Sequence, residues 1–406
     1  MNKLLIIADD LTGALDTGVC FASAGISTCV RLPVSANQHT TNEDYSVDVA
    51  IVESRHMQAA EAYKAVHEII RRMAGNRYTY VYKKTDSALR GNIGAELAAT
   101  LDATKEKTLH FIPAFPKMNR IVRQGVLYID GATPVAQSVF ATDPFNPVKH
   151  SAILELIAEQ TERNAYIAAE AEEAYDDGIA VYNAETDEDF IRIGQTLIRT
   201  IGAKLFAGCA GFANALPQLI AFDTCSEAVP LPAGKLAVFC GSVNPISLQQ
   251  CDFAEQAGYP RFHLQRAGEF LDRERITNQM VAASLRHEIV VLDTGAEDLG
   301  ATDDEVLARS TVVANHFSRV IADFLTMNPK VTLFIIGGDT LLAFARGLGI
   351  HAILPVREFL PGVVLSRYFY GGEWRYLITK SGGFGANNLF YELYQELNRP
   401  AENNRG

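Results

Sequence analysis

Short apolar runs alternate with longer segments of helical spacing along most of the chain. The first run is LLIIA at residues 4–8, after which Leu11, Leu15 and Val19 recur at helical intervals until Gly25 predicts the helix end. Further runs of strand length lie at 48–53, 79–83, 108–114, 178–184 and within 203–216, and 122–131 is patterned as a hairpin. This alternation predicts an α/β fold.

The pattern breaks at residues 222–235, where two prolines, a glycine and polar residues leave no usable period. A second α/β series follows, with apolar runs in KLAVFC, EIVVLD, VTLFII, AILP and WRYLIT. A chain of 406 residues is also too long for one ordinary core. We therefore expect two Rossmann-like α/β domains, residues 1–225 and 235–406, joined by a linker at 226–234, with an active-site cleft between them.

Composition narrows the class of protein. Hydrophobic residues make up 48% and charged residues 21%, the balance of a soluble globular chain. A formal charge of -12 disfavours non-specific binding to nucleic acid or anionic lipid, and no segment has the length of a membrane span. The six cysteines form no C-x-x-C pair, which favours reduced thiols and a cytoplasmic protein. The oligomeric state is open, with a homodimer as one outcome.

Charged and hydroxyl side chains follow the predicted strands of the first half. They are Asp9 and Asp10 after the first run, Glu53, Ser54, Arg55 and His56 after the next, and Lys83, Lys84, Thr85 and Asp86 after the third. Ligands of open α/β sheets bind outside the carboxyl ends of the strands, so these residues should gather at one edge. The cations would suit a carboxylate or phosphate, and the aspartates would suit hydroxyl groups or a metal.

Each of these residues also has an ordinary structural explanation. Asp9 or Asp10 would cap the following helix, Arg55 would pair with a neighbouring glutamate on the surface, and the lysines would lie in a solvated loop. Their recurrence after successive strands favours a binding site. Arg55 is the preferred carboxylate anchor, because its planar fork matches two oxygens. Lys117 and Arg120 in PAFPKMNR would either reach the same edge or lie in solvent.

The second half carries different chemistry at the equivalent places. GSVNP (241–245), GGDT (337–340) and SGGFG (381–385) follow predicted strands, and each is expected to lead into a helix. Small residues let backbone N–H groups approach phosphate oxygens, and a helix N-terminus favours negative charge. Glycines also end strands for steric reasons, so no segment is specific alone. Together they predict a nucleotide site, although neither a Walker motif nor a standard G-x-G-x-x-G arrangement is present.

Seven strings carry a resemblance to a known family: IADDLTGALDTG, ESRH, KKTDSALRGNIGAEL, IPAFPKMNR, FCGSVNP, IIGGDT and KSGGFG. They run in order from about residue 4 to the last predicted helix, and the chain resembles the bacterial four-carbon acid sugar kinases. This resemblance implies a sugar-acid-binding N-terminal domain, a nucleotide-binding C-terminal domain and ATP-dependent phosphorylation of a terminal hydroxyl. D-threonate is the first candidate substrate, with D-erythronate and 3-oxo-tetronate as alternatives.

The resemblance also implies roles for single residues. Substrate contacts would come from Asp9, Asp10, Arg55, Lys83, Lys84, Thr85 and Asp86. ATP contacts would come from Ser242, Gly338, Asp339, Thr340, Pro361, Gly362, Val363, Gly383 and Gly385, with Asp339 as a candidate contact of Mg²⁺. Asp86 or Asp10 is expected to be the general base, and the sequence does not choose between them; Asp339 is a third candidate for this role. A non-catalytic sensor of sugar acid and nucleotide, and an oxidoreductase acting on the same acid, remain alternatives.

Overall fold

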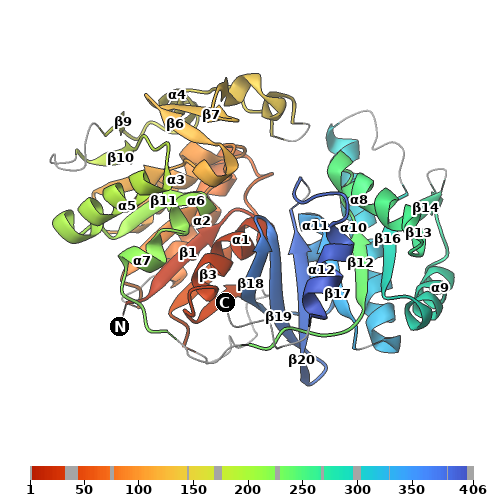
Figure 1. Cartoon of the computed structure of the whole chain (residues 1–406). Coiled ribbons are helices and arrows are strands. Elements are labelled where there is room, and N and C mark those ends of the chain that lie inside the picture. Colours follow the sequence, from red (N-terminus) through yellow and green to blue (C-terminus); the bar gives the residue numbers. More distant parts are fainter. Residues whose placement is uncertain are drawn as a thin grey trace. The chain divides into compact units, whose positions relative to one another are not determined.

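The computed structural model describes residues 2–32, 44–73, 77–143, 146–168, 176–224, 229–266, 269–295, 303–328, 330–381 and 383–399. The chain divides into two compact units, Met1–Ser226 and Glu227–Gly406, and Figure 1 shows each as a sheet flanked by helices. The boundary falls within the segment predicted as a linker, of which residues 226–228 lie outside the described part. Among the described helices, none combines the length and hydropathy needed to cross a membrane.

The first unit is built on a parallel sheet in the order β2-β3-β1-β4-β11-β5-β10-β9. Its strands are β1 (Leu4–Ala8), β2 (Thr28–Arg31), β3 (Val47–Ile51), β4 (Tyr80–Lys84), β5 (Thr108–Ile112), β9 (Ala165–Ile167), β10 (Gly178–Val181) and β11 (Leu205–Gly208). Its α-helices are α1 (Leu11–Ala22), α2 (Ala59–Met73), α3 (Ile93–Ala103), α4 (Ile153–Ala158), α5 (Asp187–Gln195), α6 (Ala210–Ala213) and α7 (Leu216–Leu219).

A smaller antiparallel sheet follows β5. It contains β6 (Ile121–Arg123), β7 (Val126–Ile129) and β8 (Thr133–Pro134), which confirms the predicted hairpin. Short helical turns flank it: η1 (Pro116–Met118), η2 (Val135–Gln137) and η3 (Val139–Thr142). A π-helical turn, η4 (Thr196–Ile201), extends α5.

The second unit is a mixed sheet in the order β13-β16-β12-β17-β20-β19-β18. The neighbours from β13 to β20 are parallel, whereas β19 runs antiparallel to both β20 and β18. Its strands are β12 (Leu236–Cys240), β13 (Arg261–His263), β16 (Ile289–Asp293), β17 (Thr332–Ile336), β18 (Ala352–Leu360), β19 (Val363–Tyr370) and β20 (Glu373–Lys380), with a separate pair β14 (Gln265–Arg266) and β15 (Glu269–Phe270). Its helices are α8 (Pro245–Gln256), α9 (Arg273–Arg286), α10 (Asp303–Met327), α11 (Gly338–Gly347) and α12 (Leu389–Leu397).

Burial explains why the strands read as continuous apolar runs. All residues of β1, β3, β12, β16 and β17 are buried, as expected for parallel strands covered on both faces. In the second unit, apolar side chains of α8 and α12 pack with β12, β16 and β17 in one core. The sequence pattern missed β19 and the short strands β2, β9, β13, β14 and β15. The short strands have too few residues to give a period, and β19 (VVLSRYFY) shows no regular alternation of apolar and polar residues.

The two units share a local topology. In each, the first strand (β1 or β12) lies centrally, the second (β2 or β13) lies two places away, and the third (β3 or β16) fills the gap. The fourth strand (β4 or β17) then pairs with the other side of the first. The connection that leaves the first strand therefore runs toward one edge of the sheet, and the connection that leaves the fourth strand runs toward the other edge. Such topological switch points are where α/β sheets bind ligands.

Candidate functional site

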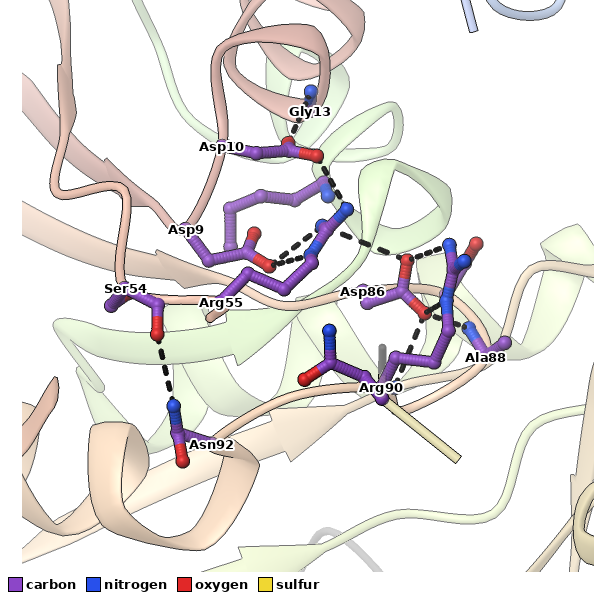
Figure 2. Close-up of polar contacts among 12 residues, drawn as sticks. Asp9, Asp10, Gly13, Ser54, Arg55, Asp86, Ala88, Arg90 and Asn92 are labelled. Carbon is purple, nitrogen blue, oxygen red and sulfur yellow. Dashed lines mark hydrogen bonds and ion pairs between the residues drawn. The ribbon is translucent and has the colours of Figure 1, made fainter. Parts of the chain in front are cut away.

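The switch point of the first unit collects three carboxylates around Arg55, as Figure 2 shows. The Arg55 guanidinium lies 2.6 Å from Asp9 Oδ2 and 2.5 Å from Asp10 Oδ2, and its Nη2 is 3.7 Å from Asp86 Oδ1. Asp10 is also the N-cap of α1, because its Oδ1 accepts a hydrogen bond from the Gly13 N–H at 2.7 Å. The capping explanation is therefore confirmed for Asp10, alongside its place in the cluster.

Arg55 has little capacity left for a ligand. Its side chain is only 16% exposed, and Nε, Nη1 and Nη2 each face a carboxylate of the protein. Burial opposes the charge, but Asp10 and Asp9 raise the pKa of Arg55 well above its usual value. The explanation of Arg55 as a surface residue is wrong. Its guanidinium holds the aspartates of two loops together.

Asp86 is equally occupied. Arg90 donates to both of its oxygens, from Nε to Oδ2 at 3.0 Å and from Nη2 to Oδ1 at 2.9 Å. The backbone N–H groups of Ala88 and Arg90 also donate to Oδ2. Burial raises the pKa of Asp86, but Arg90 and Arg55 outweigh it and hold that pKa well below the usual range. Such a carboxylate is a weak base. Arg90 was not among the predicted site residues, although it stands four residues after Asp86 in KKTDSALRGN.

The adjacent lysines Lys83 and Lys84 have different surroundings, because successive strand residues point to opposite faces of the sheet. Lys83 is 0% exposed, and its ammonium lies 2.7 Å from Glu96 Oε2 and donates to the Lys84 carbonyl at 2.7 Å. Glu96 in turn accepts from the Ser54 hydroxyl at 2.5 Å. Lys83 thus joins α3 to the sheet, and the solvated-loop explanation is wrong for it.

Lys84 is also buried, at 5% exposure, yet its ammonium has no hydrogen bond or ion pair with any residue in the described ranges. Its Nζ lies at the start of α1, where a Cβ on Gly13 would come within 2.7 Å of it. A helix N-terminus carries partial positive charge, so Lys84 and α1 together favour an anion. Gly13 leaves room for that ammonium, and sequence reasoning had not selected it.

Two more polar atoms at this switch point lack partners. Asp9 Oδ1 and Thr85 Oγ1 are buried, and neither has a hydrogen-bond partner among the described residues. Burial would raise the pKa of Asp9, but Arg55 and Lys84 lower it below the usual value, so the carboxylate is ionised and accepts. Buried polar groups are nearly always paired, so this geometry calls for a ligand with hydroxyl groups.

At the switch point of the second unit, two backbone segments pack closely. A Cβ on Gly241 would lie 1.8 Å from the Thr340 hydroxyl oxygen. The close approach of GSVNP to GGDT therefore requires glycine at position 241. Gly337 has φ 110°, and a Cβ on it would come within 3.5 Å of Ser242 N. As predicted, both segments lead into helices, α8 at Pro245 and α11 at Gly338. The Thr340 side chain is used in packing, being 2% exposed.

The turn at 361–363 and the loop at 381–385 lie together. The Ser381 N–H donates to the Gly362 carbonyl at 3.1 Å, and a Cβ on Gly362 would come within 2.7 Å of the Phe384 ring. Gly385 has φ 85°, a conformation that favours glycine. Gly383 is different: the nearest atom to a Cβ there would be Asn244 Nδ2 at 3.9 Å. The expectation that this loop leads directly into a helix is wrong, since α12 begins at Leu389; residue 382 lies outside the described part.

Gln250 and Lys380, which the sequence had not singled out, tie this loop to α8. Gln250 Nε2 donates to the carbonyls of Phe384, Gly385 and Ala386 at 2.9, 3.1 and 3.0 Å. Lys380 Nζ donates to the Ser247 hydroxyl at 3.0 Å and to the Phe384 carbonyl at 3.2 Å. Burial lowers the pKa of Lys380 to about 8. The loop at 383–385 is therefore held in part by the Lys380 ammonium, and a nearby anion would stabilise the charged form of this ammonium.

Asp339 lies exposed in the first turn of α11. It borders a cavity of about 520 Å³ between α10 and α11, which is also lined by Asn315, Arg319 and Arg346. Within the described ranges, no three His, Cys, Asp or Glu side chains form a group that could hold a metal. Asp339 alone suits an ion whose other ligands are phosphates and water, as is usual for Mg²⁺.

Comparison with known proteins agrees with this division of chemistry. The family described as "Sugar-binding N-terminal domain" matches residues 4–216, and "Nucleotide-binding C-terminal domain" matches residues 237–390. A D-threonate kinase of Salmonella typhimurium is 30% identical, with 97% of this chain and 99% of that enzyme covered. The chain belongs to the four-carbon acid sugar kinase family.

Other members of the kinase family carry different substrate names. A D-erythronate kinase of Heliobacterium modesticaldum is 25% identical, covering 96% of this chain and 95% of that enzyme. A 3-oxo-tetronate kinase of Methylobacterium radiotolerans is 27% identical, covering 95% and 96%. A crystal structure from Salmonella typhimurium LT2 aligns with a TM-score of 0.80 at 22% identity, over 98% of this chain and 100% of that one, which confirms the α/β fold.

The structure brings most of the predicted residues of this kinase family member into two clusters. In the first unit Asp9, Asp10, Arg55, Lys84, Thr85 and Asp86 meet at one switch point, with Lys83 beneath them. In the second unit the segments around Ser242, Gly338, Gly362 and Gly385 are in mutual contact. Val363 is fully buried in β19, so only its backbone can face a ligand.

Proposed function

We propose that this protein is an ATP-dependent kinase that phosphorylates the terminal hydroxyl of a four-carbon sugar acid, with D-threonate as the preferred substrate. The observation that carries the proposal is a set of groups at the first switch point with no hydrogen-bond partner among the described residues: Asp9 Oδ1, Thr85 Oγ1 and the Lys84 ammonium. An ionised carboxylate and a hydroxyl complement substrate hydroxyl groups, and a cation complements a transferring phosphoryl group. Relatives named D-threonate kinase support the choice of substrate.

In this proposal Asp10 is the general base, and Asp86 organises the site. Asp86 has both oxygens engaged by Arg90, whereas Asp10 keeps more exposed surface, 25% against 8% for the side chains. Asp10 would accept the proton of the terminal hydroxyl as its oxygen attacks the phosphorus. Lys84 and the N-terminus of α1 would offset the negative charge that develops on the phosphoryl oxygens.

The second unit would hold ATP through backbone groups. The segments at Ser242, Gly338 to Thr340, 361–363 and 383–385 offer small residues and two helix starts, which suit phosphate oxygens. Asp339 would contact Mg²⁺, which supplies charge neutralisation on the phosphates when bound. Lys380 would stabilise the loop at 383–385 in its ligand-bound form.

A coupled ADP-release assay tests the function. ADP should appear only when a four-carbon sugar acid, ATP and Mg²⁺ are all present, and kcat/KM should be highest for D-threonate among the threonate, erythronate and 3-oxo-tetronate substrates. ADP release without any acid, or none with every tetronate, would contradict the proposal. Binding of acid and ATP without turnover would instead support a sensor, and binding of NAD in place of ATP would support an oxidoreductase.

Two carboxylate variants test the assignment of the base. Asp10→Asn should lower kcat by about 10²-fold to 10⁴-fold while leaving D-threonate binding within a few-fold, because a general base acts in the chemical step. Asp86→Asn should instead lower the unfolding temperature and weaken substrate binding, since Arg90 and Arg55 lose a partner. The reverse pattern would assign the base to Asp86.

A further inference from the structure

Two arginines of the first unit share one aromatic ring but differ in their partners. The guanidinium carbons of Arg90 and Arg120 lie 5.3 and 5.1 Å from the centroid of the Phe140 ring. Arg90 pairs with the carboxylates of Asp86 and Asp143, both at 2.9 Å. Arg120 donates to the Ser87 hydroxyl, and no carboxylate of the described residues lies within ion-pair distance of it.

This difference leaves the charge of Arg120 only partly compensated within the described residues. Burial lowers the pKa of Arg120, and Arg90 lowers it further, while Asp86 acts in the opposite direction. For Arg90 the balance is reversed, because Asp86 raises its pKa above the usual value. A guanidinium removed from water and lacking an anion is costly, so the protein has prepared a position that an anionic ligand would stabilise.

The backbone holds Arg120 in a defined place. Its N–H donates to the Phe115 carbonyl at 3.1 Å, and its carbonyl accepts from the Phe115 N–H at 2.6 Å. Asn119, just before it, has φ 52°, and its carbonyl accepts from the Gly131 N–H at 2.8 Å. A non-glycine residue at positive φ is uncommon and is often found at binding sites. This short turn after β5 places the Arg120 side chain at the switch point, next to Ser87.

Arg120 and Lys84 act on the same part of the site. Both cations affect the buried Cys209 thiol just after β11: burial raises its pKa, whereas the Gly211 N–H, Lys84 and Arg120 lower it. Lys84 and Ser87, the partner of Arg120, are separated by only Thr85 and Asp86. The site thus contains two cations that form no ion pair with a carboxylate of the described residues: Lys84 at one end of this short segment, and Arg120, which donates to Ser87 at the other end.

We propose that Arg120 binds the carboxylate of the sugar acid, leaving Lys84 for the transferring phosphoryl group. This assignment rests on the proposed function. The planar fork of an arginine matches the two oxygens of a carboxylate, whereas a lysine at a helix start suits the more diffuse charge of a phosphoryl group. The sequence favours Arg55 for this role, but Arg55 and Arg90 already form ion pairs with carboxylates of the protein.

Calorimetry without nucleotide tests the assignment. Arg120→Gln should raise the Kd for D-threonate about 30-fold or more, the effect of removing one partner of a desolvated charge pair. Arg120→Lys should recover part of this loss, and both variants should bind the uncharged polyol threitol as weakly as the parent protein does. Arg123→Ala is the matched control, because Arg123 lies three residues on and pairs with Glu185 at an exposed position. It should bind D-threonate like the parent.

Three other outcomes for the Arg120 variants would contradict the assignment. Unchanged D-threonate binding with a lower kcat in Arg120→Gln would place Arg120 on the phosphoryl group and overturn the assignment. Equal losses for D-threonate and threitol, with a lowered unfolding temperature in Arg120→Lys as well, would make Arg120 structural and also overturn it. A parent protein that turns over D-threonate while Arg120→Gln binds it equally well refutes only this assignment. A parent that binds no tetronate refutes the proposed function too.

Discussion

The two switch points have the same strand topology and opposite chemistry. The first is built from charged side chains, with Arg55 among three carboxylates and Lys84 beside them, which forms no ion pair with the described residues. The second is built from close backbone contacts, as at Gly241 against Thr340 and Gly362 against Phe384. Topology therefore decides where a ligand binds, and the loop residues decide which ligand.

The difference also affects how each site is stabilised. Buried charges at the first switch point are stable only in combination, because removing one partner leaves the others uncompensated. The second site relies on glycines and on hydrogen bonds such as those from Gln250 to the carbonyls of 384–386. Substitutions should thus change protein stability most at the first site and nucleotide affinity most at the second.

The largest expected effect is that of Arg55→Ala. The variant should lose about 3–5 kcal/mol of unfolding free energy, because the carboxylate of Asp9 would remain buried without its ion-pair partner. Denaturant unfolding measures this change. Lys149→Ala serves as the control, since its ion pair with Glu159 is exposed and should contribute only about 0–1 kcal/mol. A loss as small as that of the control would mean that the carboxylates do not depend on Arg55.

Gly383→Val sharpens the comparison at the second site. Because the space around a Cβ at Gly383 is open, the fold should tolerate the side chain and the unfolding temperature should stay within a few degrees. The KM for ATP should rise about 10-fold or more, while the KM for D-threonate should stay nearly constant. Steady-state kinetics with each substrate varied in turn would show it. Equal increases for both substrates would make this loop a general structural element.

Gly13→Ala is the corresponding change in the first unit. The added Cβ would approach Lys84 Nζ and Asp10 Oδ1, so both groups must move. We expect kcat to fall by roughly 10-fold, with the KM for ATP changed less than that, since a misplaced cation and base act on the transferring group. If only the KM for ATP changed, the division of labour between the two switch points would be wrong.

The smallest effect concerns pH. Lys380 has a pKa of about 8 in the folded protein, below its usual 10.5, so its charge is lost as pH rises through 8. An ATP-bound loop should favour the charged form, and the KM for ATP should therefore increase several-fold between about pH 7 and pH 9. Lys380→Met should start with the higher KM and show a flatter pH profile.

The same residue also affects stability without ligand. Between about pH 8 and 10.5 the unfolded chain binds a proton that the folded protein does not, so the contribution of Lys380 to stability should rise with pH in this window. Thermal unfolding of the parent and of Lys380→Met across the window measures the difference. A contribution that falls with pH would contradict burial as the cause of the lowered pKa.

Much of the architecture could be predicted from the sequence. Fully buried parallel strands must be apolar throughout, so β1, β3, β12, β16 and β17 appear as continuous runs. The loops after β1, β4, β12 and β17 could be located as well, because ligand positions follow the strand ends. Local rules also predicted that Asp9 or Asp10 would cap the following helix, since a cap depends only on residues within one turn; the cap is Asp10.

Only the tertiary structure decided which charges are free. Whether Lys83 or Lys84 reaches the start of α1 depends on the sheet register, which pairs Ile7 with Lys83 and Ala8 with Lys84. Arg55 is filled by Asp9, which lies 46 residues before it, while Arg120 has no carboxylate partner in the described residues. A sequence shows where charged residues occur, but their compensation depends on partners brought close by folding, because ion pairing requires contact within a few ångström.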